Sequence, residues 1–176
     1  HYIDFASYIF NIFTVMLFNV LKKLNFEGTL AIIDYKMSNL HSVKAACRKV
    51  GLSSVITSDQ AQILDAEVAI LPGVGAFGDA MAEIHRRNLA APIVDFIRSN
   101  RPFLGICLGL QLLFERGFEN GEHEGLGVLK GEVVRFDLPP SYKVPHMGWN
   151  TVTKRADAPI LADTPENSHF YFVHSY

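Results

Sequence analysis

Residues 102–114 read PFLGICLGLQLLF, and within them the predicted secondary structure changes from strand to helix. The apolar run Pro102–Ile106 has the composition of a buried strand, and Leu110–Phe114 has the composition of a helix. Between the two runs stands Gly105-Ile106-Cys107-Leu108-Gly109, with a glycine two positions before and after the cysteine. This strand-turn-helix spacing predicts a nucleophile elbow in which Cys107 takes the place of the usual serine.

Such an elbow would give Cys107 the properties of a nucleophile. The turn holds its central residue in a strained backbone conformation, so only small residues fit on either side. At a helix start, the helix dipole and the first N–H groups favour a thiolate. The Leu108 N–H would point at the oxygen that becomes negative during attack. The alternative is a small buried hydrophobic residue, and for Cys47, on the apolar face of a helix, core packing is the prediction.

The sequence around the elbow alternates strands and helices. Short apolar runs predict four strands, at residues 29–35, 53–57, 67–72 and 102–107. Asn39 is a candidate cap for a helix that ends at Gly51. Helical sequence from about 79 to 99 is expected to break near Ala91-Pro92, because a residue before proline disfavours the helical region.

This alternation predicts an α/β fold with an open, mostly parallel sheet and helices on both faces. The site is expected at the carboxyl ends of the strands. After about residue 125 the pattern changes to a small mixed or antiparallel strand region, with strands expected at 127–136, 149–155 and 169–176.

Composition narrows the class of protein. The chain has 176 residues, 49% of them hydrophobic, which suits one α/β domain with a packed core. Its formal net charge of −2 provides no basic field for nucleic acid, so we expect no nucleic-acid partner. Two cysteines without a pairing framework favour a reducing, cytoplasmic location.

The amino-terminal residues differ from the rest. Residues 1–21 form a strongly apolar run that is long enough to cross a bilayer, and Lys22-Lys23 follow it directly. Asp4, Asn11, Thr14 and Asn19 interrupt the run, so a membrane span is not the prediction. We expect residues 1–27 to be an atypical apolar extension or translated upstream sequence, and residues 28–176 to form the domain.

A second glycine-rich loop follows the strand at 67–72. It reads Pro72-Gly73-Val74-Gly75-Ala76-Phe77-Gly78 and precedes a predicted helix. A phosphate loop is one interpretation, but the lysine of a Walker loop and the GxGxxG spacing are both missing. The other interpretation is a tight turn that aims a backbone N–H at the thiol, which acyl transfer requires.

The two loops together resemble the class I (triad) glutamine amidotransferases. A third stretch, KVPHMGWN (143–150) followed by FYFVHSY (170–176), is similar to the glutaminase subunits of imidazole glycerol phosphate synthase. The resemblance runs from about Thr29 to Tyr176. It implies that Cys107 attacks the side-chain amide of glutamine and that ammonia passes to a (β/α)₈ cyclase subunit in a heterodimer, a step of histidine biosynthesis. It implies no cofactor and no metal.

The resemblance also implies a role for particular residues. Leu108 and the loop Gly73-Val74-Gly75 match the family's oxyanion hole. Four residues match positions that contact glutamine: Gln111, Glu119, Ser175 and Tyr176. Five match the face that meets the cyclase: Pro145, His146, Met147, Trp149 and Tyr171. Without the match, each of these residues has a simpler interpretation. Gln111 could be a solvated helix residue and Glu119 a charge on a loop. Trp149 and Tyr171 could be core aromatics.

Two features depart from the family pattern. The family usually has glycines after its first strand, where this chain has Lys36 and Ser38. If either position needs a positive φ, the residue costs about 1 kcal/mol. The family's catalytic His and Glu lie in a further His-Pro-Glu segment, and this chain ends before one. No histidine of the chain is assigned as the base, and we expect the fragment to hydrolyse glutamine poorly.

Three other functions stay open at the level of sequence. A paralogous subunit could supply ammonia to another synthase, such as one that modifies a surface sugar. A non-catalytic domain could use the same fold to stabilise a partner. A cysteine hydrolase with an α/β-hydrolase sheet would share the elbow but leave KVPHMGWN unexplained.

Overall fold

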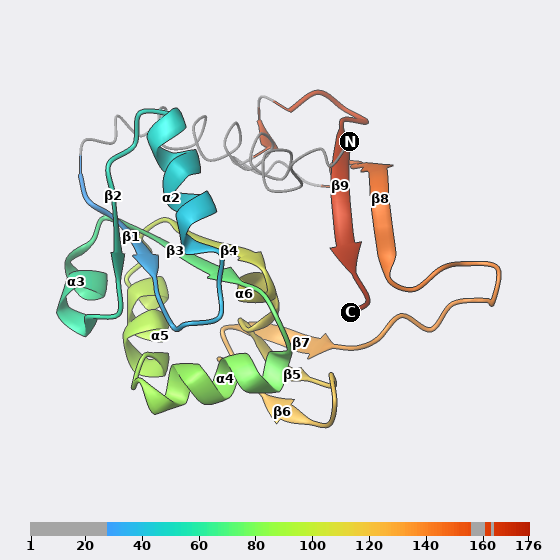
Figure 1. Cartoon of the computed structure of the whole chain (residues 1–176), viewed down its shortest axis with the longest axis horizontal. Coiled ribbons are helices and arrows are strands. Elements are labelled where there is room, and N and C mark those ends of the chain that lie inside the picture. The colour runs from blue at the N-terminus through green and yellow to red at the C-terminus, as the bar shows by residue number, and fades with distance from the viewer. Residues whose placement is uncertain (1–27, 156–160, 163) are drawn as a thin grey trace. The chain divides into compact units, whose positions relative to one another are not determined.

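A computed structural model of the chain describes residues 28–155, 161–162 and 164–176 (Figure 1). The predicted extension, residues 1–27, lies outside the described residues. Over the described ranges, no helix combines the length and the apolar character needed to cross a membrane. The described chain forms two compact units. The sheet unit comprises residues 28–44, 53–135 and Tyr176, and the hairpin unit comprises residues 45–52 and 136–175.

A four-stranded parallel sheet forms the centre of the sheet unit. Its strands are β1 (Leu30–Ile33), β2 (Ser54–Thr57), β3 (Val68–Gly73) and β4 (Phe103–Cys107), in the order β2-β1-β3-β4. All four coincide with predicted strands to within two residues. Every residue of β1 and β3 is buried, as expected for continuous apolar runs in a parallel sheet.

Alternate residues of the central strands contribute to one core. Ala31, Ile33 and Tyr35 from the first strand and its end share a face with Ala69 and Leu71 of β3. Three helices supply the other side of this core: α3 (Gln60–Asp65), α4 (Phe77–Arg86) and α5 (Ala90–Arg98). Their buried residues include Ile63, Phe77, Met81, Ile84, Ile93 and Phe96. The prediction of a parallel sheet flanked by helices is confirmed.

The first helix begins and ends where the sequence predicted. Helix α2 spans Leu40–Lys49, and the Asn39 side chain accepts a hydrogen bond from the Ser42 N–H at 3.3 Å. Gly51 follows with a φ of 78°, and the Leu52 N–H donates to the Cys47 carbonyl at 2.9 Å. This backbone conformation ends the helix at low cost, because glycine tolerates a positive φ.

The helical run is broken as predicted, but the break lies before Ala91-Pro92. The chain breaks at residues 87–89, where Asn88 has a φ of 55°, and α5 starts at Ala90. Pro92 therefore lies in the first turn of α5, where its missing N–H removes no helical hydrogen bond. Helix α3 was not predicted at all, although its cap is visible in the sequence: Asp59 accepts from the Gln62 N–H at 2.9 Å.

The helical run expected through Phe114 is wrong. Helix α6 is a single turn, Leu108–Gln111, and Phe114–Gly117 forms strand β5. This strand pairs antiparallel with β6 (His123–Glu124) and parallel with β7 (Leu129–Val133). The mixed sheet thus begins at Phe114 rather than near residue 125. Long-range backbone bonds decide the matter, because the carbonyls of Leu112 and Phe114 accept from Leu126 and Gly127.

The hairpin unit contains β8 (His146–Thr151) and β9 (His169–His174), which pair antiparallel. The predicted strand at 149–155 therefore starts three residues earlier and ends sooner. The peptide bond between Val144 and Pro145 is cis.

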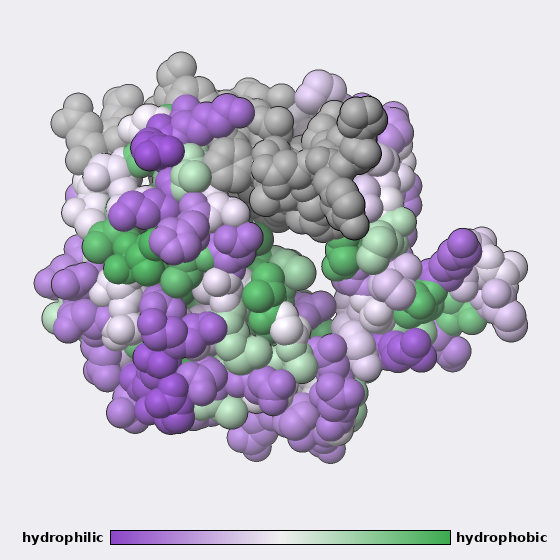
Figure 2. Space-filling view, viewed as in Figure 1, coloured by the Kyte–Doolittle hydropathy of each residue, from purple (hydrophilic) through white to green (hydrophobic). Residues whose placement is uncertain are grey.

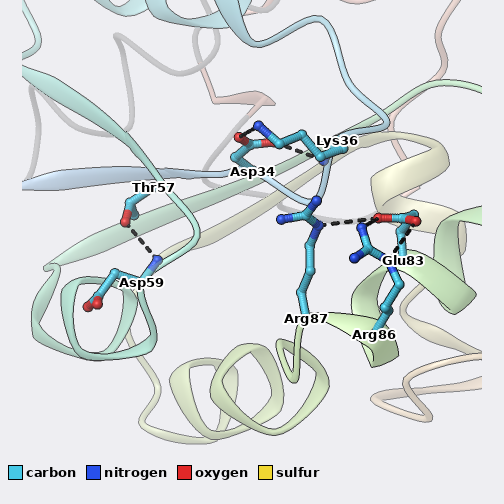
Figure 3. Close-up of polar contacts among 7 residues, drawn as sticks. All are labelled: Asp34, Lys36, Thr57, Asp59, Glu83, Arg86 and Arg87. Carbon is cyan, nitrogen blue, oxygen red and sulfur yellow. Dashed lines mark hydrogen bonds and ion pairs between the residues drawn. The ribbon is translucent and has the colours of Figure 1, made fainter.

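Charged side chains occupy the solvent side of α4. Hydrophilic residues predominate in the part of Figure 2 where Figure 1 places α4 and β6. Figure 3 shows Arg86 and Arg87 approaching Glu83, with Nη2 of Arg86 2.6 Å and Nε of Arg87 3.2 Å from Oε2. Helix α4 therefore presents charges to solvent and its apolar face to the core.

Candidate functional site

Cys107 occupies the turn between β4 and α6. It has a φ of 54° and a ψ of −119°, and its side chain is exposed. A non-glycine residue with positive φ is uncommon, and such strain is concentrated at functional sites. The structure thus gives Cys107 the strained, accessible position that the elbow motif predicts.

The glycines on either side have no room for a side chain. A Cβ added to Gly105 would lie 2.7 Å from the Leu110 Cα, and one added to Gly109 would overlap the Leu71 carbonyl oxygen. These contacts are with backbone atoms, which cannot move aside cheaply. Both glycines are therefore required by the close approach of α6 to β3 and β4.

The second glycine-rich loop lies beside Cys107. Gly73 is the register partner of Cys107 at the ends of β3 and β4. The exposed Val74 follows, and its N–H donates to the Met37 carbonyl at 3.0 Å. In this conformation the Val74 amide is engaged by the loop after β1. Gly75 has a φ of 101°, and a Cβ there would lie 2.9 Å from the Met37 Cε, so the two loops are closely packed.

Three of the four predicted substrate residues, Gln111, Glu119 and Tyr176, belong to the sheet unit. The Glu119 Oε2 accepts a hydrogen bond from the Phe77 N–H at 2.9 Å, which fixes the carboxylate at the first residue of α4. The Gln111 side-chain amide donates to the Tyr176 carbonyl at 3.3 Å. Ser175 belongs to the hairpin unit, where its carbonyl accepts from the Phe136 N–H at 2.9 Å.

Tyr35 also lies at this edge of the sheet, and the sequence analysis did not single it out. Its side chain is fully buried and its hydroxyl has no hydrogen-bond partner, while a Cβ added to Gly73 would lie 2.6 Å from the hydroxyl oxygen. Burial raises the pKa of the phenol well above its usual range, and the negative charge of Cys107 raises it further. Its position two residues after Ile33, on the same face and at the carboxyl end of a strand, is the signal that could have found it.

The two residues in place of family glycines differ from each other. Lys36 has a φ of 73°, so it carries the backbone cost that the sequence suggested. Its N–H and Nζ both bond the Asp34 carboxylate, at 2.8 and 3.2 Å (Figure 3). Ser38 is not among the residues with positive φ, but its Oγ is buried without a hydrogen-bond partner.

The predicted partner residues lie together in the hairpin unit. Met147 is 59% and Trp149 47% exposed, and Trp149 meets Tyr171 edge-on at 5.4 Å between ring centroids. His146 pairs with His174 across the strands, with Nδ1 3.1 Å from Nε2, and stacks on Phe172 at 5.0 Å. Pro145 is exposed at the start of β8.

The remaining candidates have simpler environments. Cys47 is fully buried, as predicted for a core residue. Among the residues that the structure describes, no cluster of three or more His, Cys, Asp or Glu side chains could hold a metal ion.

Comparisons with a family model and with individual proteins identify the same family. A model of the family "Glutamine amidotransferase class-I" matches residues 31–176. The chain is 60% identical over 147 residues to imidazole glycerol phosphate synthase subunit HisH of Rhodopirellula baltica, covering 84% of this chain and 71% of that protein. The subunits of the same name from Desulfitobacterium hafniense and Aquifex aeolicus are 48% and 50% identical, with 84% and 82% of this chain and 69% and 70% of those proteins covered.

Proposed function

The chain belongs to the class-I glutamine amidotransferases, and from this premise we propose how its site acts. It is a glutaminase of the type found in imidazole glycerol phosphate synthase, and it provides ammonia for a step of histidine biosynthesis. The observation that carries the proposal is the backbone of Cys107, whose φ of 54° holds the exposed thiol at the start of α6.

Cys107 is the nucleophile. Its sulfur attacks the side-chain amide carbon of glutamine and a C–S bond forms, while the thiol proton passes through a base to the amide nitrogen. The C–N bond then breaks, ammonia leaves and a γ-glutamyl thioester remains. Water hydrolyses the thioester to glutamate and restores the thiol. We assign the base to none of the seven histidines of the chain.

Backbone amides stabilise the oxyanion that forms in each step. The Leu108 N–H, the first amide of α6, is the first donor. The second comes from the loop Gly73-Val74-Gly75, which lies beside Cys107 in the sheet. The Val74 amide can serve only after it leaves the Met37 carbonyl, so the loop after β1 controls whether that donor is available.

Glutamine binds between α4, α6 and the end of the chain. The Glu119 carboxylate, held by the Phe77 N–H, provides a negative charge for the α-ammonium group of the substrate. Gln111 and Tyr176 complete the site within the sheet unit, and the family resemblance adds Ser175 to the residues that contact glutamine. The hydrogen bond from Gln111 to the Tyr176 carbonyl supports this grouping for two of the three.

A (β/α)₈ cyclase subunit is the partner, and the hairpin unit supplies the surface that binds it. Exposed Met and Trp side chains are typical of protein interfaces, and Met147 and Trp149 lie on one strand. Pro145, His146 and Tyr171 belong to the same surface. The proposed reaction needs no cofactor. We place the protein in the cytoplasm, because a reducing compartment keeps an exposed catalytic cysteine as a thiol. We propose no role in nucleic-acid binding.

Covalent labelling tests the assignment of Cys107. The chain is incubated with 6-diazo-5-oxo-L-norleucine, a glutamine-like electrophile, and the modified residue is identified by peptide mass spectrometry. We expect one adduct on Cys107 and protection by glutamine. Cys47→Ala should label like the wild type, and Cys107→Ser should not label.

The outcomes separate this function from its alternatives. An adduct on Cys47, or labelling that glutamine does not reduce, would contradict a glutaminase site at Cys107. A folded protein that is never labelled would favour a non-catalytic partner domain.

A further inference from the structure

Tyr35 places a buried polar group beside Gly73, the register partner of Cys107, and no hydrogen bond among the described residues uses it. Its side chain is 0% exposed, and its hydroxyl is one of two buried side-chain polar atoms that lack a hydrogen-bond partner in the described residues. A buried hydroxyl without a partner destabilises the folded state. Such a group in a native structure therefore calls for an explanation, and a role in catalysis is one of the few available.

The hydroxyl lies where the parts of the elbow meet. The point at which a Gly73 side chain would begin is 2.6 Å from the Tyr35 oxygen, 2.7 Å from the Gly109 nitrogen and 2.9 Å from the Leu108 Cβ. Gly73 is in turn the register partner of Cys107. The hydroxyl thus lies between the end of β3 and the first residues of α6, next to the glycine that pairs with Cys107.

We propose that Tyr35 is a positioning residue for Cys107, and that its buried O–H is held without a partner as a donor for the negative charge that forms at the cysteine. This role rests on the proposed function of Cys107. A donor that is unpaired in the resting enzyme gains its hydrogen bond only when charge appears, so it favours the charged form over the neutral thiol. The folded state carries the cost of the unpaired group in exchange.

The ionisation behaviour of the phenol supports this role. Burial and the charge of Cys107 both raise the pKa of Tyr35, so the hydroxyl keeps its proton across the pH range in which a thiol ionises. The group is therefore a donor under all working conditions, and no second negative charge competes with the thiolate.

The test is Tyr35→Phe, which keeps the ring and removes only the hydroxyl. Two quantities are measured on the whole chain: the melting temperature, and the rate at which iodoacetamide alkylates Cys107 between pH 6 and pH 10. We expect the melting temperature to rise by about 3 °C, because a buried unpaired hydroxyl is lost. Alkylation should be about tenfold slower at pH 7 and change less than about twofold at pH 10, because an ordinary thiol ionises at that pH without help from a donor.

Controls distinguish this role from general damage. Tyr142→Phe removes a hydroxyl from a tyrosine that is 65% exposed, and should change neither quantity. Cys107→Ser gives the background from Cys47. Replacement of Tyr35 by 3-fluorotyrosine, a stronger donor, should speed alkylation at pH 7.

Each result bears on one conclusion. If Tyr35→Phe raises the melting temperature but alkylates like the wild type, the hydroxyl is a packing defect and the proposal is overturned. Equal slowing at pH 7 and pH 10 would also overturn it, because access and not charge would then have changed. If wild-type Cys107 resists both iodoacetamide and the glutamine-like label, the nucleophile assignment fails first and the role of Tyr35 fails with it.

Discussion

Gly73 and Cys107 are register partners at the carboxyl ends of two neighbouring parallel strands. Their pairing places the glycine-rich loop after β3 beside Cys107 at the end of β4, although the two residues are 34 positions apart in the sequence. Parallel strands bring successive carboxyl ends to one edge of a sheet, which is where sites form in open α/β folds. The site thus depends on tight packing at this edge, and the first prediction tests that packing.

Gly109→Ala is expected to destabilise the protein by about 3 kcal/mol, because the new methyl group overlaps the Leu71 carbonyl oxygen. Chemical denaturation measures the loss. Gly127→Ala is the matched control: it has open space within 4 Å and a φ of 62°, so it should lose only about 1 kcal/mol from backbone strain. Equal losses in the two variants would show that close packing under α6 is unimportant.

Lys36→Gly should stabilise the protein by about 0.5 kcal/mol. Relief of a positive φ of 73° gains more than the exposed pair with Asp34 and the greater freedom of the unfolded chain lose. Lys44→Gly, the same change at an exposed position within α2, should instead cost about 1 kcal/mol. Thermal melts of the two variants should move in opposite directions, and a loss with Lys36→Gly would contradict the expectation.

Arg101→Ala should cost about 2 kcal/mol. One guanidinium nitrogen donates to the carbonyls of Leu64 and Ala66, both at 2.6 Å, and so closes the end of α3. The guanidinium also lies 4.2 Å from the centre of the Phe96 ring. Arg98→Ala removes an exposed arginine from the neighbouring helix end and should stay within about 0.5 kcal/mol. Urea denaturation compares the two variants. Similar losses of unfolding free energy would show that the hydrogen bonds from Arg101 to the Leu64 and Ala66 carbonyls do not stabilise the fold.

The stability of α4 should depend on pH through Glu83. Hydrogen bonds from Arg86, and then from Arg87, lower the pKa of this carboxyl. The ion pairs therefore stabilise the folded state above the ordinary glutamate pKa, and the effect disappears as the pH falls through the lowered value. Glu83→Gln should melt below the wild type at neutral pH and approach it in acid. A melting-temperature gap that stays constant down to strongly acid pH would refute the linkage.

Trp149→Ala should separate partner binding from folding. Because the side chain is 47% exposed, we expect the melting temperature to change little while capture of a cyclase subunit in a pull-down falls at least tenfold. Tyr142→Ala, which removes another exposed aromatic, should bind like the wild type. Undiminished capture by Trp149→Ala would exclude this face of the hairpin as the interface.

Local patterns were sufficient where short-range physics controls the chain. The four parallel strands, the Asn39 cap and the strained elbow at Cys107 all follow from apolar runs, side-chain caps and glycine spacing. The same reasoning placed the break between α4 and α5 incorrectly, because it treated Pro92 as the end of a helix. The first turn of a new helix tolerates proline equally well.

Residues 108–114 show why local patterns have a limit. Their composition suits a helix, and α6 begins there, but pairing with segments later in the chain turns Phe114–Gly117 into a strand. A hydrogen bond to a distant segment leaves no periodic trace in the sequence. The same holds for the carboxylate of Glu119, which the fold brings to the Phe77 N–H from 42 residues away.

The sequence by itself determined the class of fold and the family, and it singled out Cys107 as the candidate nucleophile, because each rests on residues close together in the chain. Only the tertiary structure decided that the Val74 amide bonds the Met37 carbonyl and that the Tyr35 hydroxyl lies unpaired against Gly73. These contacts arise where three strand ends meet, and they depend on distances between backbones and on burial from water. The identities of neighbouring residues determine neither the distances between backbones nor burial. The candidate reactive residues could therefore be predicted from the sequence, but their contacts could not.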